Sequence, residues 1–215
     1  MDTRRKPRKV TKGDVTREAM KQAAKRVFAV DGFHNAKIVD LTAEASRSPG
    51  AFYRYFQSKE ALLSELLEEF QTQLRQSINR PLDPGQSALE NIESSVRMFW
   101  RIYRENWPIA TAAFQLSMVN RDFARAWRNF RRNGIKALAT VIRKAQQEGY
   151  CPGLDTELAA SALCSMIEYS CYNWTANGGD YPERNVDDVV AVEVLRTLIL
   201  NAVGWRNDRG SSGTE

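Results

Sequence analysis

Apolar residues recur three and four positions apart along almost the whole chain, and runs in which β-branched and polar residues alternate are nearly absent. Such spacing gathers apolar side chains on one face of a helix, whereas a half-buried strand needs alternation with a period of two. The 215-residue chain is 43% hydrophobic, which is enough to build a sizeable core. The sequence therefore predicts an all-α fold.

Capping and turn residues set the first helix boundaries. The first helix is expected to begin after Asp14 and to end at Asp31-Gly32, where glycine accepts a left-handed conformation. After two short helices, Ser58 is expected to cap a helix that runs to about residue 80, because the proline-rich segment 81–85 stops it there. The face that the first helix is expected to bury consists of Val15, Ala19, Ala23, Val27 and Val30.

The rest of the chain shows five further helical stretches. Pro108 and Asn120 mark two of the breaks between them, and residues 149–153 mark a third. Asn185 and Asp188 are placed as a capping pair for the last helix. The predicted helices cover residues 86–105, 108–118, 121–148, 155–176 and 186–204.

Basic charge is concentrated at the N-terminus. Residues 1–12 carry six basic side chains and one acidic one, so this segment alone has a formal charge of +5, equal to that of the whole chain. A basic arm beside a folded unit suits contact with phosphate groups, and a solubilising disordered end is the alternative interpretation. The tail over residues 206–215 is rich in Gly and Ser and is expected to be disordered.

Several classes of protein are disfavoured by what the composition lacks. Cys151, Cys164 and Cys171 form an odd count without CxxC spacing, so we expect reduced, mostly buried thiols rather than disulfides or a zinc site. His34 is the one histidine and is expected in a surface loop, so no metal site and no cofactor are predicted. Because no 18 uncharged apolar residues follow one another, we expect neither membrane spanning nor secretion, and a cytoplasmic location.

The segment over residues 38–56, IVDLTAEASRSPGAFYRYF, has the pattern of two short helices joined by a tight turn. Ser48 is placed to cap the second helix, and Pro49 suits its first position, where a missing N–H costs nothing. Gly50 leaves the start of that helix bare, so that its backbone amides can approach a phosphate closely. The segment is therefore predicted to be a helix-turn-helix whose second helix enters the major groove of DNA.

The spacing of aromatic residues assigns the two faces of this second helix. Phe52 and Phe56 lie four positions apart and are expected to face a small core with Val27, Phe28 and Leu41. An ordinary helical hairpin, whose aromatic residues merely pack together, is the alternative. The side chains expected to point outward are Ala51, Arg54 and Tyr55, with part of Tyr53.

Residues 16–67 resemble the N-terminal domain of the TetR family of regulators, a stretch that is roughly a quarter of the chain. The rest of the chain matches that family only in length, helical content and general layout. The residues that carry the resemblance are Ala24, Phe28, Gly32-Phe33, Asp40-Leu41, Ala45, Ser48-Pro49-Gly50, Phe52-Tyr53-Arg54-Tyr55-Phe56 and Ser58-Lys59-Glu60-Ala61-Leu62.

The resemblance implies which residues contact an operator. Lys59, at the start of the following helix, is expected to hold a phosphate. The chain departs from the family pattern at Lys37, where Thr or Ser usually opens the second helix, and at Ser46-Arg47, where a Gly-hydrophobic pair usually forms the turn. Ser at a turn that needs positive φ costs on the order of 1 kcal/mol. The complete predicted DNA-binding set is Lys37, Arg47, Ser48, Pro49, Gly50, Ala51, Tyr53, Arg54, Tyr55 and Lys59.

Large aromatic and apolar residues gather between residues 96 and 130 and again in the helix over 155–176. Helical cores use mostly Leu, Ile, Val and Ala, so bulky aromatics suggest the wall of an apolar cavity with a few polar groups. A filled core is the alternative interpretation. The predicted ligand-binding set is Phe99, Trp100, Tyr103, Trp107, Phe114, Met118, Phe123, Trp127, Cys164, Ile167, Glu168, Cys171 and Tyr172.

The last two predicted helices carry apolar stripes with small residues among them. In the family that the chain resembles, such a pair docks against its two-fold copy as a four-helix bundle. A homodimer would present two recognition helices to a palindromic operator. The stripes consist of Leu158, Ala162, Ser165 and Tyr169 in one helix, and of Val189, Val192, Leu195 and Ile199 in the other.

Together these features predict a DNA-binding transcriptional regulator that a lipophilic effector releases from its operator. The resemblance implies a repressor, because most members of that family are repressors. In this hypothesis the effector shifts the helix over residues 58–80. A regulator without a small ligand, whose body serves protein contacts, is one alternative, and an all-helical enzyme is another. No pair of titratable groups at catalytic spacing supports an enzyme. The expected domains are a basic arm over 1–13, a helix-turn-helix domain over 14–60, a ligand-binding and dimerisation domain over 61–205 and a tail over 206–215.

Overall fold

The protein is all-helical over the residues that the computed structural model describes, which are 11–78, 88–176, 180, 183–184 and 186–204. The expected basic arm, the proline-rich connector, Asn185 and the expected tail lie wholly or largely outside these residues. The helices are α1 (Lys12–Asn35), α2 (Ile38–Glu44), α3 (Pro49–Phe52), α4 (Lys59–Ile78), α5 (Ala88–Ser117), α6 (Arg121–Gln147), α7 (Thr156–Ala176) and α8 (Asp188–Ala202).

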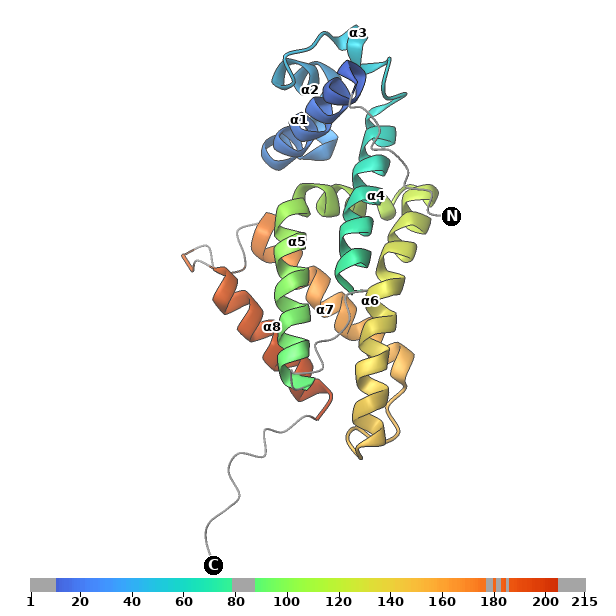
Figure 1. Ribbon diagram of the computed structural model, residues 1–215, viewed down its shortest axis with the longest axis vertical. Helices are drawn as coiled ribbons and strands as arrows, with labels where there is room; N and C mark the ends of the chain where they lie inside the picture. Colours follow the sequence, from blue (N-terminus) through green and yellow to red (C-terminus); the bar gives the residue numbers. More distant parts are fainter. Residues whose placement is uncertain (1–10, 79–87, 177–179, 181–182, 185, 205–215) are drawn as a thin grey trace, which may run out of the picture.

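A small head of α1, α2 and α3 sits at one end of the elongated molecule, and α5 to α8 form the larger body (Figure 1). Helix α4 begins in the head and runs down between α5 and α6. Its leucines and Phe70 belong to the same buried cluster as Phe28 and Phe52 of the head and Trp100 of the body. One apolar core is therefore continuous through α4.

Helix α1 begins earlier than the sequence indicated. Thr11 caps it: the Asp14 amide donates to Thr11 Oγ1 at 3.1 Å, and the Thr11 amide donates back to Asp14 Oδ2 at 2.9 Å. Gly32 interrupts the helix with φ of 72°, as its expected left-handed role requires, and one further turn follows.

The predicted buried face of α1 was partly wrong. Val15 and Val30 are 56% and 83% exposed. The buried side chains belong to a neighbouring stripe, because α1 must face the head core and α5 at the same time. That stripe consists of Met20, Ala23, Ala24, Val27 and Phe28.

The predicted break at Asn106-Trp107-Pro108 was also wrong, since α5 continues through Pro108. Proline has no amide to donate to the carbonyl one turn earlier, which bends a helix without always ending it. Figure 1 shows α5 changing direction along its course, with its later part passing behind α4. Asn106 is accordingly buried, at 2% exposure, rather than part of a loop.

The other helix boundaries follow the predicted signals closely. The Ala61 amide donates to Ser58 Oγ at 3.1 Å, which confirms Ser58 as the cap of α4. Asn120 Oδ1 accepts from the amides of Asp122 and Phe123 and so caps α6. Helix α8 is capped by Asp187, whose side chain accepts from the amides of Val189 and Val190; Asn185 of the expected capping pair lies outside the described residues.

Candidate functional site

The segment that joins α2 to α3 forms the tip of the head (Figure 1). Ala45 ends α2, and Ser46 then takes φ of 53°, the left-handed conformation that the turn was expected to need. The Arg47 amide donates to the Thr42 carbonyl at 2.8 Å and closes the turn. Ser48 occupies the capping position of α3, but its side chain makes no capping hydrogen bond.

Phe52 and Phe56 are buried with Phe28 and Leu41, as predicted, and their rings lie 5.5 Å apart. Helix α3 is only four residues long, and turns continue it to Phe56. The buried rings of Phe52 and Phe56 thus anchor the segment on the core, and its opposite face is exposed to solvent.

The exposed face contains most of the predicted DNA-binding residues. The exposed members are Lys37, Arg47, Ser48, Pro49, Gly50, Tyr53 and Arg54. Tyr55 is only half-buried, because its ring packs on the core. Ala51 is 4% exposed, so its predicted outward position was wrong. Ala51 lies on the same helical face as Phe52 and Phe56, one and five positions before them. That face meets the core, while Tyr53 and Arg54 point outward.

Lys59 has an internal role that the sequence did not suggest. Its ammonium donates to the carbonyls of Phe33 at 2.5 Å, Ala36 at 2.7 Å and His34 at 3.4 Å, and lies 4.4 Å from the centre of the Phe33 ring. Burial lowers the pKa of Lys59. The ammonium thus satisfies the carbonyls at the C-terminal end of α1, where positive charge is favourable. This geometry favours a structural role over the predicted phosphate contact.

Ion pairs fasten the head to α4. Arg17 pairs with Glu65, and Lys21 Nζ lies 3.2 Å from Glu65 Oε2 and 2.5 Å from Glu69 Oε1. Burial lowers the pKa of Lys21, but hydrogen bonds to Glu69 and Glu65 outweigh this effect and the net shift is upward. Arg17 also lies 4.8 Å from the centre of the Phe56 ring. The start of α4 therefore moves with α1.

A second connection joins the head to α5. Lys25 Nζ donates to Asn106 Oδ1 at 3.0 Å, and Asn106 Nδ2 donates to Gln73 Oε1 and to the Ile102 carbonyl, both at 2.9 Å. One buried amide therefore links α1, α4 and α5. This amide was not predicted, because Asn106 was expected in a break between two helices.

The predicted ligand-binding residues fall into three groups by burial. Most lie in the body interior, where the rings of Phe114 and Trp127 are 5.5 Å apart and those of Phe114 and Tyr172 are 5.9 Å apart. Met118 is 68% exposed at the turn between α5 and α6, so its predicted inward position was wrong. The buried members are Trp100, Tyr103, Phe123, Cys164 and Cys171, and the half-buried ones are Phe99, Trp107, Phe114, Trp127, Ile167, Glu168 and Tyr172.

The aromatic contacts extend beyond the predicted set. Phe130 stacks on Trp127 with 5.0 Å between ring centres and lies 4.9 Å from Phe70 of α4. Phe70 in turn lies 6.3 Å from Tyr103. This chain of rings reaches from α7 through α6 to α4, the helix that also contacts the head.

Trp100, predicted to line a ligand site, forms a hydrogen bond to α8 instead. Its indole Nε1 donates to Asp188 Oδ1 at 2.8 Å, and its ring lies 6.1 Å from that of Trp174. Arg104 also pairs with Asp188. The hydrogen bond from Trp100 lowers the pKa of Asp188. Trp100 therefore anchors the start of α8 on α5.

One buried ion pair lies beside the aromatic chain. Arg131 Nε donates to Glu168 Oε2 at 2.6 Å, and Cys164 Sγ donates to Glu168 Oε1 at 3.3 Å. Burial raises the pKa of Glu168, and Arg131 offsets that rise only in part. Burial likewise raises the pKa of Cys164 and of Cys171, so both thiols stay protonated. Of the three free cysteines, Cys151 alone is half-buried.

The two predicted dimer stripes differ in exposure. In α7, Leu158 and Tyr169 are 71% and 61% exposed, and Ala162 and Ser165 are exposed as well. In α8 only Val189 is exposed; the other three members are buried against the rest of the body, chiefly α5. The predicted α8 stripe was therefore the inner one. The exposed apolar stripe of α8 consists of Val190, Val194 and Leu198.

Within the parts of the chain that the structure places, no group of three His, Cys, Asp or Glu residues could hold a metal ion. Over the same residues, no helix is long and apolar enough to cross a membrane.

A three-helix head with a helix-turn-helix tip, carried on a larger helical body, defines a DNA-binding regulator. Residues 22–66 match the model of the family described as bacterial regulatory proteins, tetR family. The match covers the later part of α1, all of α2 and α3, and the first part of α4.

Similarity to known proteins extends over the body as well. The chain is 27% identical over 207 residues to the uncharacterized HTH-type transcriptional regulator YdgC of Bacillus subtilis, covering 92% of this chain and 98% of that protein. It is 25% identical to the HTH-type transcriptional repressor NicS of Pseudomonas putida, over 82% of this chain and 84% of that protein. These relatives are named as regulators of transcription, not as enzymes.

A solved structure supports the fold of the body. The transcriptional regulator FadR of Bacillus subtilis, solved in complex with stearoyl-CoA, superposes with a TM-score of 0.68 at 19% identity. The alignment covers 88% of this chain and 99% of that chain.

Proposed function

We propose that this regulator is a dimeric, cytoplasmic repressor that binds a palindromic operator and leaves it when a lipophilic effector enters the body. The observation that carries the proposal is the chain of rings from Tyr172 through Phe114, Trp127 and Phe130 to Phe70, which brings the body interior into contact with α4. Because α4 is ion-paired to the head, a change in this interior has a direct route to the DNA-binding face.

The operator contacts belong to the exposed tip of the head. Tyr53 and Arg54 are exposed and are assigned to base edges, and the exposed Lys37 and Arg47 are assigned to the flanking phosphates. Ser48, Pro49 and Gly50 open the same surface. The proposed set leaves out Ala51, which packs on the core, and Lys59, which donates to carbonyls at the end of α1. Tyr55 stays in the set, although its ring also packs on the core.

The effector site is assigned to the aromatic interior and the Arg131–Glu168 pair beside it. An apolar wall with few polar groups is the usual composition of a small-molecule site. Two of the similar proteins support parts of this proposal: FadR of Bacillus subtilis was solved in complex with stearoyl-CoA, and NicS is named as a transcriptional repressor. The effector in this chain is lipophilic, and the buried pair orients its polar end.

The dimer surface is assigned to the exposed stripes of α7 and α8. Leu158 and Tyr169 on α7 and Val194 and Leu198 on α8 leave apolar area in water that a second copy would bury. A two-fold pair of these helices gives the isologous interface that a palindromic operator requires.

Release from DNA is the experiment that tests the proposal. Fluorescence anisotropy follows the protein on a labelled operator while saturated fatty acids and their CoA esters of increasing length are added. The proposal expects release by at least one of these compounds, weakened at least tenfold by Trp127→Ala and unchanged by Met118→Ala, its exposed control. Binding of such a compound without any change in operator affinity would contradict it.

A further inference from the structure

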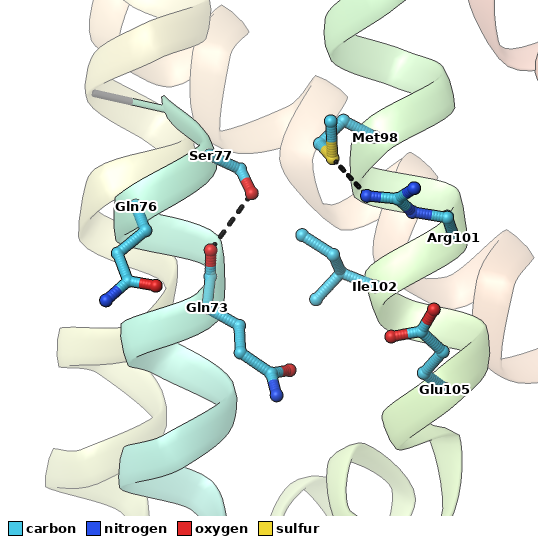
Figure 2. Close-up of a pocket in the computed structure, with 7 residues that line it drawn as sticks. All are labelled: Gln73, Gln76, Ser77, Met98, Arg101, Ile102 and Glu105. Carbon is cyan, nitrogen blue, oxygen red and sulfur yellow. Dashed lines mark hydrogen bonds between the residues drawn. The ribbon is translucent and has the colours of Figure 1, made fainter. Parts of the chain in front are cut away.

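A pocket opens between α4 and α5 on the outside of the body, apart from the aromatic interior. Its volume is about 300 Å³, at the small end of the range for sites that bind small molecules. Figure 2 shows Met98 and Ile102 of α5 pointing toward α4 across it. It is lined by Gln73, Gln76, Ser77, Met98, Arg101, Ile102 and Glu105.

The α5 wall of this pocket carries two opposite charges four residues apart. Arg101 and Glu105 do not pair with each other or with another charged group among the described residues, although neighbouring charges at this spacing commonly do. Among the residues that the structure places, the Arg101 guanidinium donates only to Met98 Sδ, at 3.0 Å. Both charges are therefore available to a ligand.

The α4 wall carries neutral hydrogen-bonding groups. Gln73, Gln76 and Ser77 line this side, and the Ser77 hydroxyl donates to the Gln73 carbonyl at 3.0 Å, whereas the Gln76 amide points away from α5 (Figure 2). Ile102, which is 5% exposed, lies between the two walls. The pocket thus offers a cation, an anion, an amide and one apolar contact within the space of a small molecule.

The pocket also touches the connection between body and head. Gln73, a lining residue, accepts the hydrogen bond of the buried Asn106, and Asn106 accepts that of Lys25 from α1. Asn106 precedes Pro108 in the stretch of α5 that lacks one backbone hydrogen bond. A ligand that draws the Gln73 amide into the pocket takes an acceptor from Asn106 and so disturbs the contact with α1.

We infer that this pocket is a second effector site for a small zwitterion of the amino-acid type. Its carboxylate binds Arg101, its ammonium binds Glu105, and its side chain lies on Ile102. Occupancy alters operator affinity through Gln73, Asn106 and Lys25. The inference goes beyond the lipophilic effector, since it uses other residues and another class of ligand, and it depends only on the protein being a DNA-binding regulator.

The first test measures binding. The twenty standard L-amino acids are tested one by one against the full-length protein by saturation-transfer NMR, and hits are titrated by calorimetry. At least one is expected to bind with a Kd below about 1 mM, which corresponds to about 4 kcal/mol. Its N-acetyl and carboxamide derivatives, each lacking one charge, are expected to bind at least tenfold more weakly. No binding at 10 mM, or equal binding of the derivatives, overturns the inference.

Variants locate the binding in this pocket. Arg101→Gln and Glu105→Gln are each expected to weaken the amino acid at least tenfold. Arg97→Gln, one turn earlier on the same helix and paired with Glu93, is the matched control and is expected to change nothing. Circular dichroism of each variant confirms that it folds. Equal affinity in all three variants would place the ligand elsewhere and overturn the assignment.

A second test measures the coupling to DNA. In the wild-type protein the amino acid is expected to change operator affinity at least threefold, and the operator must change amino-acid affinity by the same factor. Lys25→Met leaves the pocket intact, so it is expected to keep amino-acid binding within twofold and to lose the effect on the operator. A wild-type protein that binds the amino acid and the operator independently would contradict the coupling. Arg101→Gln is also tested for release from the operator by fatty acids and their CoA esters. If these compounds still release it, a failure of the amino-acid test concerns this pocket alone and not the proposed function.

Discussion

Arg131 and Glu168 form a hydrogen-bonded ion pair, 2.6 Å between Nε and Oε2, whose side chains are only 21% and 12% exposed. The Arg131 guanidinium also donates to Ser165 Oγ and to the Ser161 carbonyl, so it holds α6 to α7. Because both charges have lost most of their water, neither is tolerated without the other.

The first prediction concerns this pair. Arg131→Met is expected to lower the free energy of unfolding by about 3 kcal/mol, because it leaves a buried carboxylate unpaired. The double variant Arg131→Met with Glu168→Leu is expected to recover most of that loss. Arg143 lies on α6 like Arg131 and forms an exposed ion pair with Glu157 of α7. Arg143→Met should therefore lower the free energy of unfolding by less than about 1 kcal/mol. Urea unfolding measures all three, and a double variant no more stable than Arg131→Met would contradict the explanation.

The same variant gives a pH dependence with a definite sign. Burial already raises the pKa of Glu168, and loss of Arg131 removes the charge that opposes this rise. An acid whose pKa is raised in the folded state penalises folding above that pKa, and the penalty fades as the pH falls through it toward the ordinary 4.5. Arg131→Met should therefore lose less stability at pH 5 than at pH 8, and a loss that grows as the pH falls would exclude this cause.

Lys59 and Lys37 form a second test, because both are lysines of the head with different surroundings. Lys59→Met removes the donor for three carbonyls at the end of α1 and should cost about 1–2 kcal/mol of unfolding free energy. It should leave the salt dependence of operator binding unchanged. Lys37→Met is expected to leave the free energy of unfolding unchanged. It should lower the slope of the logarithm of operator affinity against the logarithm of salt concentration by about 1. The opposite pattern would restore Lys59 as a phosphate contact.

Gly50 offers a separation of folding from binding. A Cβ built at this position meets no atom within 4 Å, so the protein itself has room for a side chain there. Gly50→Ala is expected to keep or slightly raise stability, by up to about 1 kcal/mol, because alanine favours the helix. It should nevertheless weaken operator binding at least tenfold, since the added methyl group keeps the backbone from the DNA. Full operator affinity in a stable variant would show that Gly50 lies away from the DNA.

Arg54 and Arg47 should differ in kind. Arg54→Gln is expected to relax specificity at one base pair and to cost about 1–3 kcal/mol on the cognate sequence alone. Arg47→Gln is expected to weaken cognate and unrelated DNA about equally and to lower the salt slope. Competition binding with point-mutated operators measures both effects. A uniform loss in Arg54→Gln would move that residue to the phosphate backbone.

Local signals predicted the head well. The aromatic spacing of Phe52 and Phe56, the left-handed turn at Ser46 and the cap at Ser58 each depend on neighbours within a few residues, and the structure confirms all three. Ala51 was misplaced because it shares one helical face with Phe52, Tyr55 and Phe56, and that whole face packs on the core.

The body was predicted less completely because its features depend on contacts far apart in the sequence. Pro108 signals a break locally, yet packing keeps α5 continuous through it. Helix α8 has an apolar stripe on each of two faces, so its periodicity alone does not predict which stripe packs against α5. Arg131 was not among the predicted residues, because only the fold brings it to Glu168, 37 residues away. Periodicity thus identifies faces, and tertiary packing decides how each is used.

Selection from genomic DNA gives the most direct measurement of what this chain recognises. Fragmented DNA of the source organism is bound to the purified protein at two salt concentrations, and the retained fragments are sequenced. We predict one enriched motif with two inverted half-sites about one helical turn apart, bound about a thousandfold more tightly than scrambled DNA. Retention of all fragments alike, with the same salt dependence, would mean phosphate contacts only and would contradict operator recognition by the Arg54 face.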